Sequence, residues 1–502
     1  MTGSPVLAAF EAPNIDLHAL APEILLTVTL SVVLLADLAF EDRARWASSS
    51  IAGLGLLVSL VPVLTLATDG SDRALFGGAY VVDDFALVLK ALFLGAGYVT
   101  ILMSTDYIAE GDYREGEYYF MLLSSLLGMS VMASARDLLS IFVALELLSI
   151  PVYLLAGWRK RDLRGNEASL KYYLLGVFAS AVMLYGMSLV FGVAGSTVLT
   201  EINDALAEAP GTVSAVTVGI VFILVGFGFK ISAVPFHTWA PDTYQGAPTP
   251  ITAFLSVASK TAGFVAILQL IFISFLGRSD VWGPLLWVLA ALTMTVGNLI
   301  ALRQTNVVRL LAYSSVAQAG FMLVPLAVAG DLEAGPGTAM EAVVTYLLIY
   351  AAMNLGAFAA VMAVARKTRS GEIASFGGLF SYAPGLAVLM TVFLFALAGI
   401  PPLAGWYAKF VMFRAVFEAL TPSAVVLGVI AAVNSVIALF YYAGVARAMW
   451  MSPVPDGDTR AVQVPSALAA SLGLCAVATL VLGVVPNLVG RLGDLATFGV
   501  LP

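Results

Sequence analysis

Long apolar runs separated by short polar connections divide this sequence from about residue 20 to residue 490. A helix needs about 20 mostly apolar residues to cross the hydrocarbon core of a bilayer. The pattern predicts about fourteen spans, at residues 20–39, 50–68, 82–103, 117–134, 138–157, 167–193, 213–234, 248–276, 282–302, 305–329, 341–365, 383–413, 422–448 and 463–490. The longest polar connections have only about 10 to 20 residues, which leaves no room for a soluble domain. We therefore expect an all-α polytopic membrane protein.

Composition agrees with the hydrophobic pattern. Of 502 residues, 60% are hydrophobic and 11% are charged, whereas about 25% are charged in an ordinary soluble domain. The net charge of −8 argues against nucleic acid as a partner. The single cysteine, Cys475, can form no internal disulfide. The first 20 residues carry no lysine or arginine, so we expect no cleaved signal peptide.

Basic residues in the connections predict the orientation, because lysine and arginine gather in cytoplasmic loops. The expected cytoplasmic loop ends hold Arg43, Arg45, Arg114, Arg159, Lys160, Arg161, Arg164, Arg303, Arg309, Arg366, Lys367, Arg369, Arg447 and Arg460. The opposite loop ends hold only Arg73, Arg136, Arg278, Arg414 and Arg491. With an even number of spans, both termini are expected on the outer face.

The other five basic residues are lysines inside predicted spans: Lys90, Lys171, Lys230, Lys260 and Lys409. A charge inside the membrane is costly unless it is paired, hydrated or able to reach the interface. Unlike arginine, a buried lysine can release its proton. Five lysines in such positions fit proton handling.

Two of these lysines lie beside proline breaks. Lys230 precedes the break in GFGFKISAVPFHTWAPDTYQGAPTP, and Lys409 follows the break in AGIPPLAGWYAK. Interrupted helices in two halves of a transporter mark its transport path, so the first break, with His237 and Asp242 just beyond it, suits an ion site. The alternative is that Lys230 reaches the interface from a helix end.

The remaining intramembrane charges are ambiguous. Glu146 lies in the middle of a span, either as a partner that tunes a lysine or as a protonated structural acid. Lys260 lies near the middle of its span. Lys171 follows Glu167 by four residues and could form a surface salt bridge, and Lys90 lies near two aspartates, which favours a structural role.

Motifs for cofactors are missing from the sequence. It has no phosphate-binding glycine loop and no cysteine cluster, and its two histidines, His18 and His237, are far apart. These features argue against haem, zinc or iron–sulfur ligation. We expect no redox cofactor on this chain.

The stretch FKISAVPFHTWAPDTYQGAPTPITAFLSVASK resembles the signature segment of the antiporter-like membrane subunits of respiratory complex I. LELLSIPVYLL and AGIPPLAGWYAKF match the same family, and the resemblance covers most of the chain. It implies two inverted five-helix repeats, each with a broken helix. The implied domains are the N-terminal helices at residues 1–116, the repeats at 117–276 and 277–449, and a C-terminal helix within 450–502.

The resemblance also assigns roles to residues. Glu146 would modulate its partner Lys230, Lys260 would be the central relay, and Lys409 would lead to the outer side. Lys171 matches a family lysine, and His237 would line the connection between half-channels. The second repeat has no matching acid, and its helix near residue 313 offers only Tyr313, Ser314, Ser315 and Gln318.

The implied function is proton translocation within NADH:quinone oxidoreductase, driven by electron transfer from NADH to quinone in other subunits. NAD, FMN, iron–sulfur clusters and quinone would then reside on partner subunits. The partners would be other antiporter-like and small membrane subunits in the bacterial plasma membrane. A multisubunit Na⁺/H⁺ antiporter and a purely structural scaffold are the alternatives.

Overall fold

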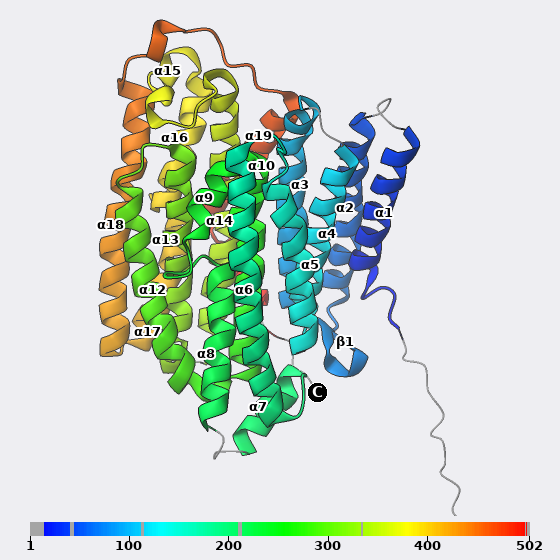
Figure 1. Cartoon of the computed structure of the whole chain (residues 1–502). Helices are drawn as coiled ribbons and strands as arrows, with labels where there is room; N and C mark the ends of the chain where they lie inside the picture. Colours follow the sequence, from blue (N-terminus) through cyan, green and yellow to red (C-terminus); the bar gives the residue numbers. More distant parts are fainter. Residues whose placement is uncertain are drawn as a thin grey trace, which may run out of the picture.

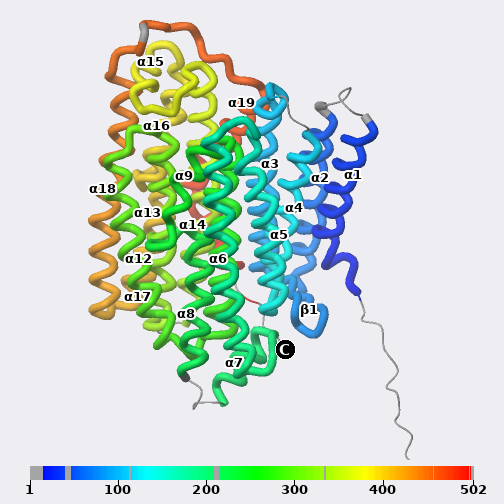
Figure 2. The backbone as a smooth tube through the Cα atoms, viewed as in Figure 1, coloured from blue at the N-terminus to red at the C-terminus, as the bar shows by residue number. Residues whose placement is uncertain are grey.

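The computed structural model describes residues 15–40, 45–111, 115–208, 213–332, 335–496 and 498. Its helices stand side by side in one bundle (Figure 1), and the backbone trace follows them up and down (Figure 2). Eleven helices of the described part are long and apolar enough to cross a membrane. Helix α4 and two helices broken midway supply the other three predicted spans. The prediction of a fourteen-span all-α membrane protein is therefore confirmed.

Three helices form the N-terminal part. They are α1 (Ala21–Phe40), α2 (Arg45–Asp69) and α3 (Asp84–Ala109). A short antiparallel hairpin, β1 (Arg73–Leu75) and β2 (Tyr80–Val82), joins α2 to α3, with Arg73 opposite Val82. Asp83 caps α3 by accepting a hydrogen bond from the Ala86 amide.

Five spans follow, and the fourth is broken. They are α4 (Glu115–Ser134), α5 (Leu138–Ala156), α6 (Leu163–Ala194), the pair α8 (Val213–Lys230) and α9 (Trp239–Gly246), and a composite span. The composite span consists of α10 (Thr249–Phe254), a π-helix (Leu255–Ser259), α11 (Lys260–Gln269) and a second π-helix (Leu270–Ser274).

The next five spans repeat this arrangement. They are α12 (Ser279–Ala301), α13 (Val307–Val328), α14 (Gly337–Thr368), the broken pair α16 (Pro384–Ala398) and α17 (Gly405–Ala419), and α18 (Pro422–Met451). The broken helix is again the fourth. Helices α4 and α12 begin at opposite ends of the bundle (Figure 1), as inverted repeats require. The exact domain boundaries stay a prediction.

The last span is α19 (Ser466–Val484). In the described part of the chain, 3₁₀ turns connect other elements at Phe76–Gly78, Leu276–Arg278, Ala329–Asp331, Ile373–Phe376 and Pro455–Gly457, and α15 (Leu379–Tyr382) is a single helical turn. The described residues that precede α1 lie toward the lower end of the bundle in Figure 1. The termini themselves, which we expect on the outer face, lie outside the described residues.

Two short helices differ from the sequence-based expectation. Helix α7 (Leu199–Glu208) occupies a predicted loop, and α20 (Asn487–Leu495) begins where we expected the last span to continue. Each has one apolar side, with Leu199 and Ile202 buried on α7 and Val489 buried on α20. They are too short to span a bilayer, so a search for long apolar runs misses them.

The bundle is apolar on its outside as well as in its core. The span Thr249–Ser274 is buried from Pro250 to Ser274 and forms the centre of the bundle. On α18, by contrast, Val436 is 70% exposed and Phe440 is 74% exposed. Large exposed apolar surfaces of this kind require a partner or lipid.

We predict that Gly128→Ala destabilises the protein. A Cβ atom at Gly128 would lie 2.6 Å from the Leu148 amide nitrogen and 2.9 Å from the Ala144 carbonyl oxygen, so α4 and α5 would have to separate. Overpacking of this kind costs about 1–3 kcal/mol. Thermal unfolding in mild detergent measures the effect. Gly473→Ala is the control because a Cβ atom there meets nothing within 4 Å; equal unfolding temperatures for the two variants would contradict the prediction.

Candidate functional site

Three lysines lie in the interior of the bundle, close to the two broken helices. Lys230 is the last residue of α8, Lys260 begins α11 at the centre, and Lys409 lies on α17 just after the second break. Their exposed fractions are 4%, 1% and 7%. An ammonium group at such positions needs nearby oxygen acceptors.

Lys230 is held by α5. Its Nζ donates to Ser149 Oγ at 2.8 Å, and Ser149 Oγ in turn donates to the Leu145 carbonyl oxygen at 2.5 Å. Glu146 lies one turn before Ser149 on the same helix. The lysine is therefore bound to a neutral hydroxyl and not to a carboxylate.

Glu146 and Lys230, which we expect to act as partners, do not form a direct ion pair, and the modulating role of Glu146 stays a prediction. Glu146 Oε1 accepts a hydrogen bond from Ser180 Oγ of α6 at 2.6 Å, and no ion pair within 4.0 Å joins it to Lys230 in the described part of the chain. Each of the two charges is instead hydrogen-bonded to its own serine. Glu146 and Ser149 are three residues apart in LELLSIP, and side chains at that spacing lie on the same face of a helix.

The break after α8 leaves few backbone groups without partners. The Val234 amide donates to Thr293 Oγ1 of α12 at 2.9 Å, and the Ala233 amide donates to the Gly228 carbonyl at 2.8 Å. Trp239 Nε1 donates to the Phe229 carbonyl oxygen at 3.1 Å. Protein groups thus replace the missing helical bonds, which is the condition for irregular backbone at membrane depth.

Lys260 is held by the second repeat. Its Nζ donates to the carbonyl oxygen of Ser315 at 2.5 Å and to Ser315 Oγ at 2.6 Å. Tyr350 OH of α14 donates to the same Ser315 Oγ at 2.9 Å. Gly263 lies one turn beyond Lys260, and a Cβ atom there would lie 3.2 Å from Lys230 Cγ. The stem of Lys230 therefore packs directly against the helix that carries Lys260.

Two further polar side chains of helix α13, Gln318 and Ser314, are hydrogen-bonded to neighbouring helices. Gln318 Nε2 donates to the Leu397 carbonyl oxygen at 3.0 Å, and Tyr346 OH donates to Gln318 Oε1 at 2.5 Å. Ser314 Oγ and Tyr442 OH share a hydrogen bond at 2.5 Å. Hydroxyl and amide groups from α13, α14 and α18 fill the place where the first repeat has Glu146.

Lys409 binds the end of the broken helix before it. Its Nζ donates to the Ala398 carbonyl oxygen at 2.7 Å and lies 4.8 Å from the centre of the Phe321 ring. Gly399 has φ +91°, and a Cβ atom there would lie 2.7 Å from Lys409 Cδ. Leu397 and Ala398, adjacent in sequence, thus accept from Gln318 and Lys409. The polar groups run from Lys260 to Lys409, with one helical turn between Ser315 and Gln318.

Lys171 and His237 are not hydrogen-bonded to Lys230, Lys260 or Lys409. Lys171 Nζ pairs with Glu167 at 2.7 Å, as its spacing predicted, and with Asp242 at 2.9 Å. The ring of His237 is 6.4 Å from that of Tyr313, and its Nδ1 has no hydrogen-bond partner among the described residues.

Sequence reasoning missed three ion pairs. Asp242 also binds Arg309 at 2.8 Å and so links α6, α9 and α13. Lys90 pairs with Glu23 at 2.9 Å and not with the nearby aspartates, whereas Asp83 pairs with Arg136 at 2.8 Å. These partners are 53 to 67 residues apart, so local spacing gives no signal for them.

The described residues contain no group of three or more histidine, cysteine, aspartate or glutamate side chains that could hold a metal ion. The chemistry that the arrangement offers is the transfer of protons among ammonium, hydroxyl and carboxylate groups.

Comparison with known proteins shows the family to which this chain belongs. The family described as the transmembrane region of NADH:quinone oxidoreductase and Mrp antiporters matches residues 135–435. NADH-quinone oxidoreductase subunit N of Trichlorobacter lovleyi is 38% identical over 95% of this chain and 96% of the relative. Subunit N of an Anaeromyxobacter species is 40% identical over 92% of this chain and 93% of the relative.

Solved structures agree with the sequence comparisons. A chain of respiratory complex I from Thermus thermophilus has a TM-score of 0.76 at 32% identity and covers 94% of this chain and 98% of its own. A chain of the Mrp complex from a Dietzia species has a TM-score of 0.83 at 22% identity, covering 96% of this chain and 97% of its own, and shares the fold. With its broken helices and buried lysines, this chain belongs to the family of NADH:quinone oxidoreductase/Mrp antiporter membrane proteins.

Proposed function

We propose that this chain is a proton-translocating membrane subunit, of the subunit N type, in an NADH:quinone oxidoreductase. Protons would pass through Lys230, Lys260 and Lys409, with Glu146 acting on Lys230. Electron transfer from NADH to quinone in other subunits, which would hold the FMN, iron–sulfur clusters and quinone, would drive the movement. The bacterial plasma membrane, with both termini outside, is the proposed location.

One observation carries the proposal: Lys230, Lys260 and Lys409 are bonded to neutral oxygen atoms. A lysine bonded to a carboxylate leaves an unpaired buried charge when it loses its proton, which is strongly unfavourable. A lysine bonded to a hydroxyl or carbonyl leaves no such charge. These three lysines can therefore change protonation at less cost than Lys90, which is paired with Glu23.

The work of moving a charge across the membrane and the free energy of one hydrogen bond to a charged group are of similar size. Moving one charge against 100 mV costs about 2.3 kcal/mol. A hydrogen bond to a charged group contributes about 1.5–3 kcal/mol. Forming or breaking one hydrogen bond to an ammonium group can thus change the free energy of proton release by an amount comparable with the work of moving one charge across the membrane. Lys171, His237 and the polar cavity of about 380 Å³ that Lys171 and Asp242 line would serve proton access.

We predict that Lys409→Arg lowers proton translocation roughly tenfold or more, because arginine keeps the charge but does not release a proton. NADH-driven acidification of inverted membrane vesicles measures it. Lys90→Arg is the matched control, since arginine can still pair with Glu23, and it should translocate at nearly the normal rate. Normal translocation by an assembled Lys409→Arg variant would contradict the role of Lys409.

We predict that Ser149→Ala slows proton translocation by roughly tenfold, because it removes the acceptor of the Lys230 ammonium group. The same vesicle assay, normalised to the amount of assembled protein, measures the change. Ser188→Ala is the control because that hydroxyl bonds only to the Tyr185 carbonyl of its own helix. Equal rates for the two variants would show that Ser149 has no role in transfer.

The antiporter alternative is favoured by the fold shared with the Mrp complex and by the family description. Co-purification separates it from the oxidoreductase proposal. We expect a tagged chain, extracted in mild detergent, to bring flavin and iron–sulfur subunits and NADH oxidation with it. Recovery with antiporter subunits alone, together with Na⁺-dependent proton exchange, would overturn the oxidoreductase proposal.

A further inference from the structure

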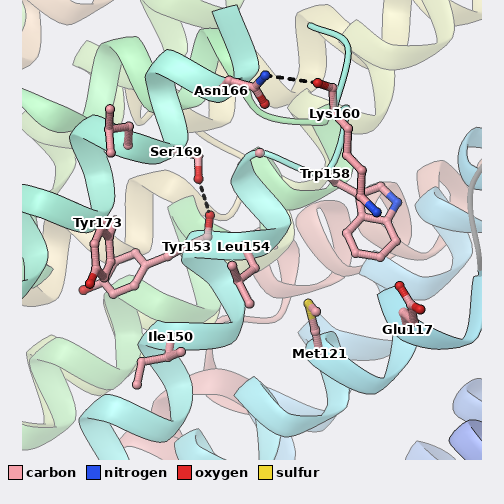
Figure 3. A pocket seen from close by; sticks show the side chains of 12 residues that line it. Glu117, Met121, Ile150, Tyr153, Leu154, Trp158, Lys160, Asn166, Ser169 and Tyr173 are labelled. Carbon is pink, nitrogen blue, oxygen red and sulfur yellow. Dashed lines mark hydrogen bonds between the residues drawn. The ribbon is translucent and has the colours of Figure 1, made fainter. Parts of the chain in front are cut away.

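A cavity of about 620 Å³ opens on the side of the bundle between α4, α5 and α6 (Figure 3). It lies at the end of the bundle where Arg159, Lys160, Arg161 and Arg164 connect α5 to α6. None of the proposed proton-transfer residues lines it. Its volume is in the range of ordinary small-molecule sites.

The wall of the cavity is apolar at one end and polar at the other. One end is formed by apolar side chains, including Met121 of α4 and Ile150 and Leu154 of α5. Ile150 is 51% exposed and Leu154 is 55% exposed, so this end is open to the surroundings of the bundle. The other end is formed by Lys160 and Asn166, which lie together at one side of the view in Figure 3.

Hydrogen bonds between the lining residues fix the shape of the polar end. Asn166 Nδ2 donates to the Lys160 carbonyl oxygen at 3.1 Å, and Ser169 Oγ donates to the Tyr153 carbonyl oxygen at 2.7 Å. Trp158 and Tyr173 also line the cavity, and such side chains favour the level of the lipid headgroups.

Two opposite charges line the cavity and have no hydrogen-bond or ion-pair partner among the residues that the structure describes. The Lys160 ammonium and the Glu117 carboxylate make no hydrogen bond or ion pair that the described residues provide, although the Lys160 backbone is engaged. They come from different elements, since Glu117 lies in the first turn of α4 and Lys160 in the connection after α5. A bound group that carries both charges would satisfy them together.

We propose that this cavity binds a glycerophospholipid with a phosphoethanolamine headgroup. Lys160 would bind the phosphate, Glu117 would accept hydrogen bonds from the ammonium group, and an acyl chain would lie along Met121, Ile150 and Leu154. Basic pockets between membrane helices recognise lipid headgroups in this way. Phosphatidylglycerol would leave Glu117 without a cation, and the methylated ammonium of phosphatidylcholine has no N–H to donate.

The test uses the full chain with all subunits that co-extract from its host. The protein is exchanged into nanodiscs of phosphatidylcholine that contain a minor fraction of phosphatidylethanolamine or phosphatidylglycerol, and native mass spectrometry counts the retained lipids. The unaltered protein should retain phosphatidylethanolamine in preference to both others. Lys160→Gln should lower this retention about fivefold, the effect of removing one basic residue from a lipid contact.

Two further variants separate specific binding from general attraction. Arg161→Gln removes the same charge from an adjacent exposed residue that does not line the cavity, and it should leave retention unchanged. Glu117→Gln should abolish the preference for phosphatidylethanolamine over phosphatidylglycerol while keeping binding to phosphate. Equal losses in Lys160→Gln and Arg161→Gln would overturn the proposal. So would crosslinking of the cavity to a partner subunit in place of lipid.

Discussion

Every ammonium group in the interior of this bundle needs an oxygen atom, because a bare charge in a low-dielectric environment is strongly unfavourable. The chain meets this constraint in two ways. Lys90 and Arg136 face the carboxylates of Glu23 and Asp83. Lys230, Lys260 and Lys409 instead face hydroxyl and carbonyl oxygens. The first kind of site fixes a charge and links α1, the start of α3 and the connection between α4 and α5, whereas the second tolerates either protonation state.

The helix breaks create some of these acceptors. Where α16 ends, the carbonyl groups of Leu397 and Ala398 are free of helical bonding and accept from Gln318 and Lys409. Where α8 ends, Thr293 and Trp239 bind the backbone groups that the break releases. The break next to Lys409 therefore leaves carbonyl oxygens available to an ammonium group.

Much of this organisation can be predicted from the sequence, because helices must be long and apolar to cross a bilayer and prolines interrupt them locally. The spans, both breaks and the burial of all three lysines follow from such short-range patterns. The partners of those lysines do not, since Lys260 meets Ser315 from 55 residues away and Lys230 meets Ser149 from 81 residues away. The sequence suggested Glu146 as the partner of Lys230, but it could not show that each of these two charges is hydrogen-bonded to a serine, one of which lies on α6. Helices α7 and α20 were missed because neither is long enough to span a membrane.

The acceptor of Lys409 is a main-chain atom, the carbonyl oxygen of Ala398. No side-chain replacement at position 398 deletes that oxygen; only a change in the path of the backbone would remove it. The same holds for the Leu397 carbonyl that Gln318 binds. At this end of the proposed proton route, point mutations of the acceptor residues therefore leave the acceptor oxygens in place. The geometry of these oxygens depends instead on Gly399, whose positive φ sets the direction in which the chain leaves the helix.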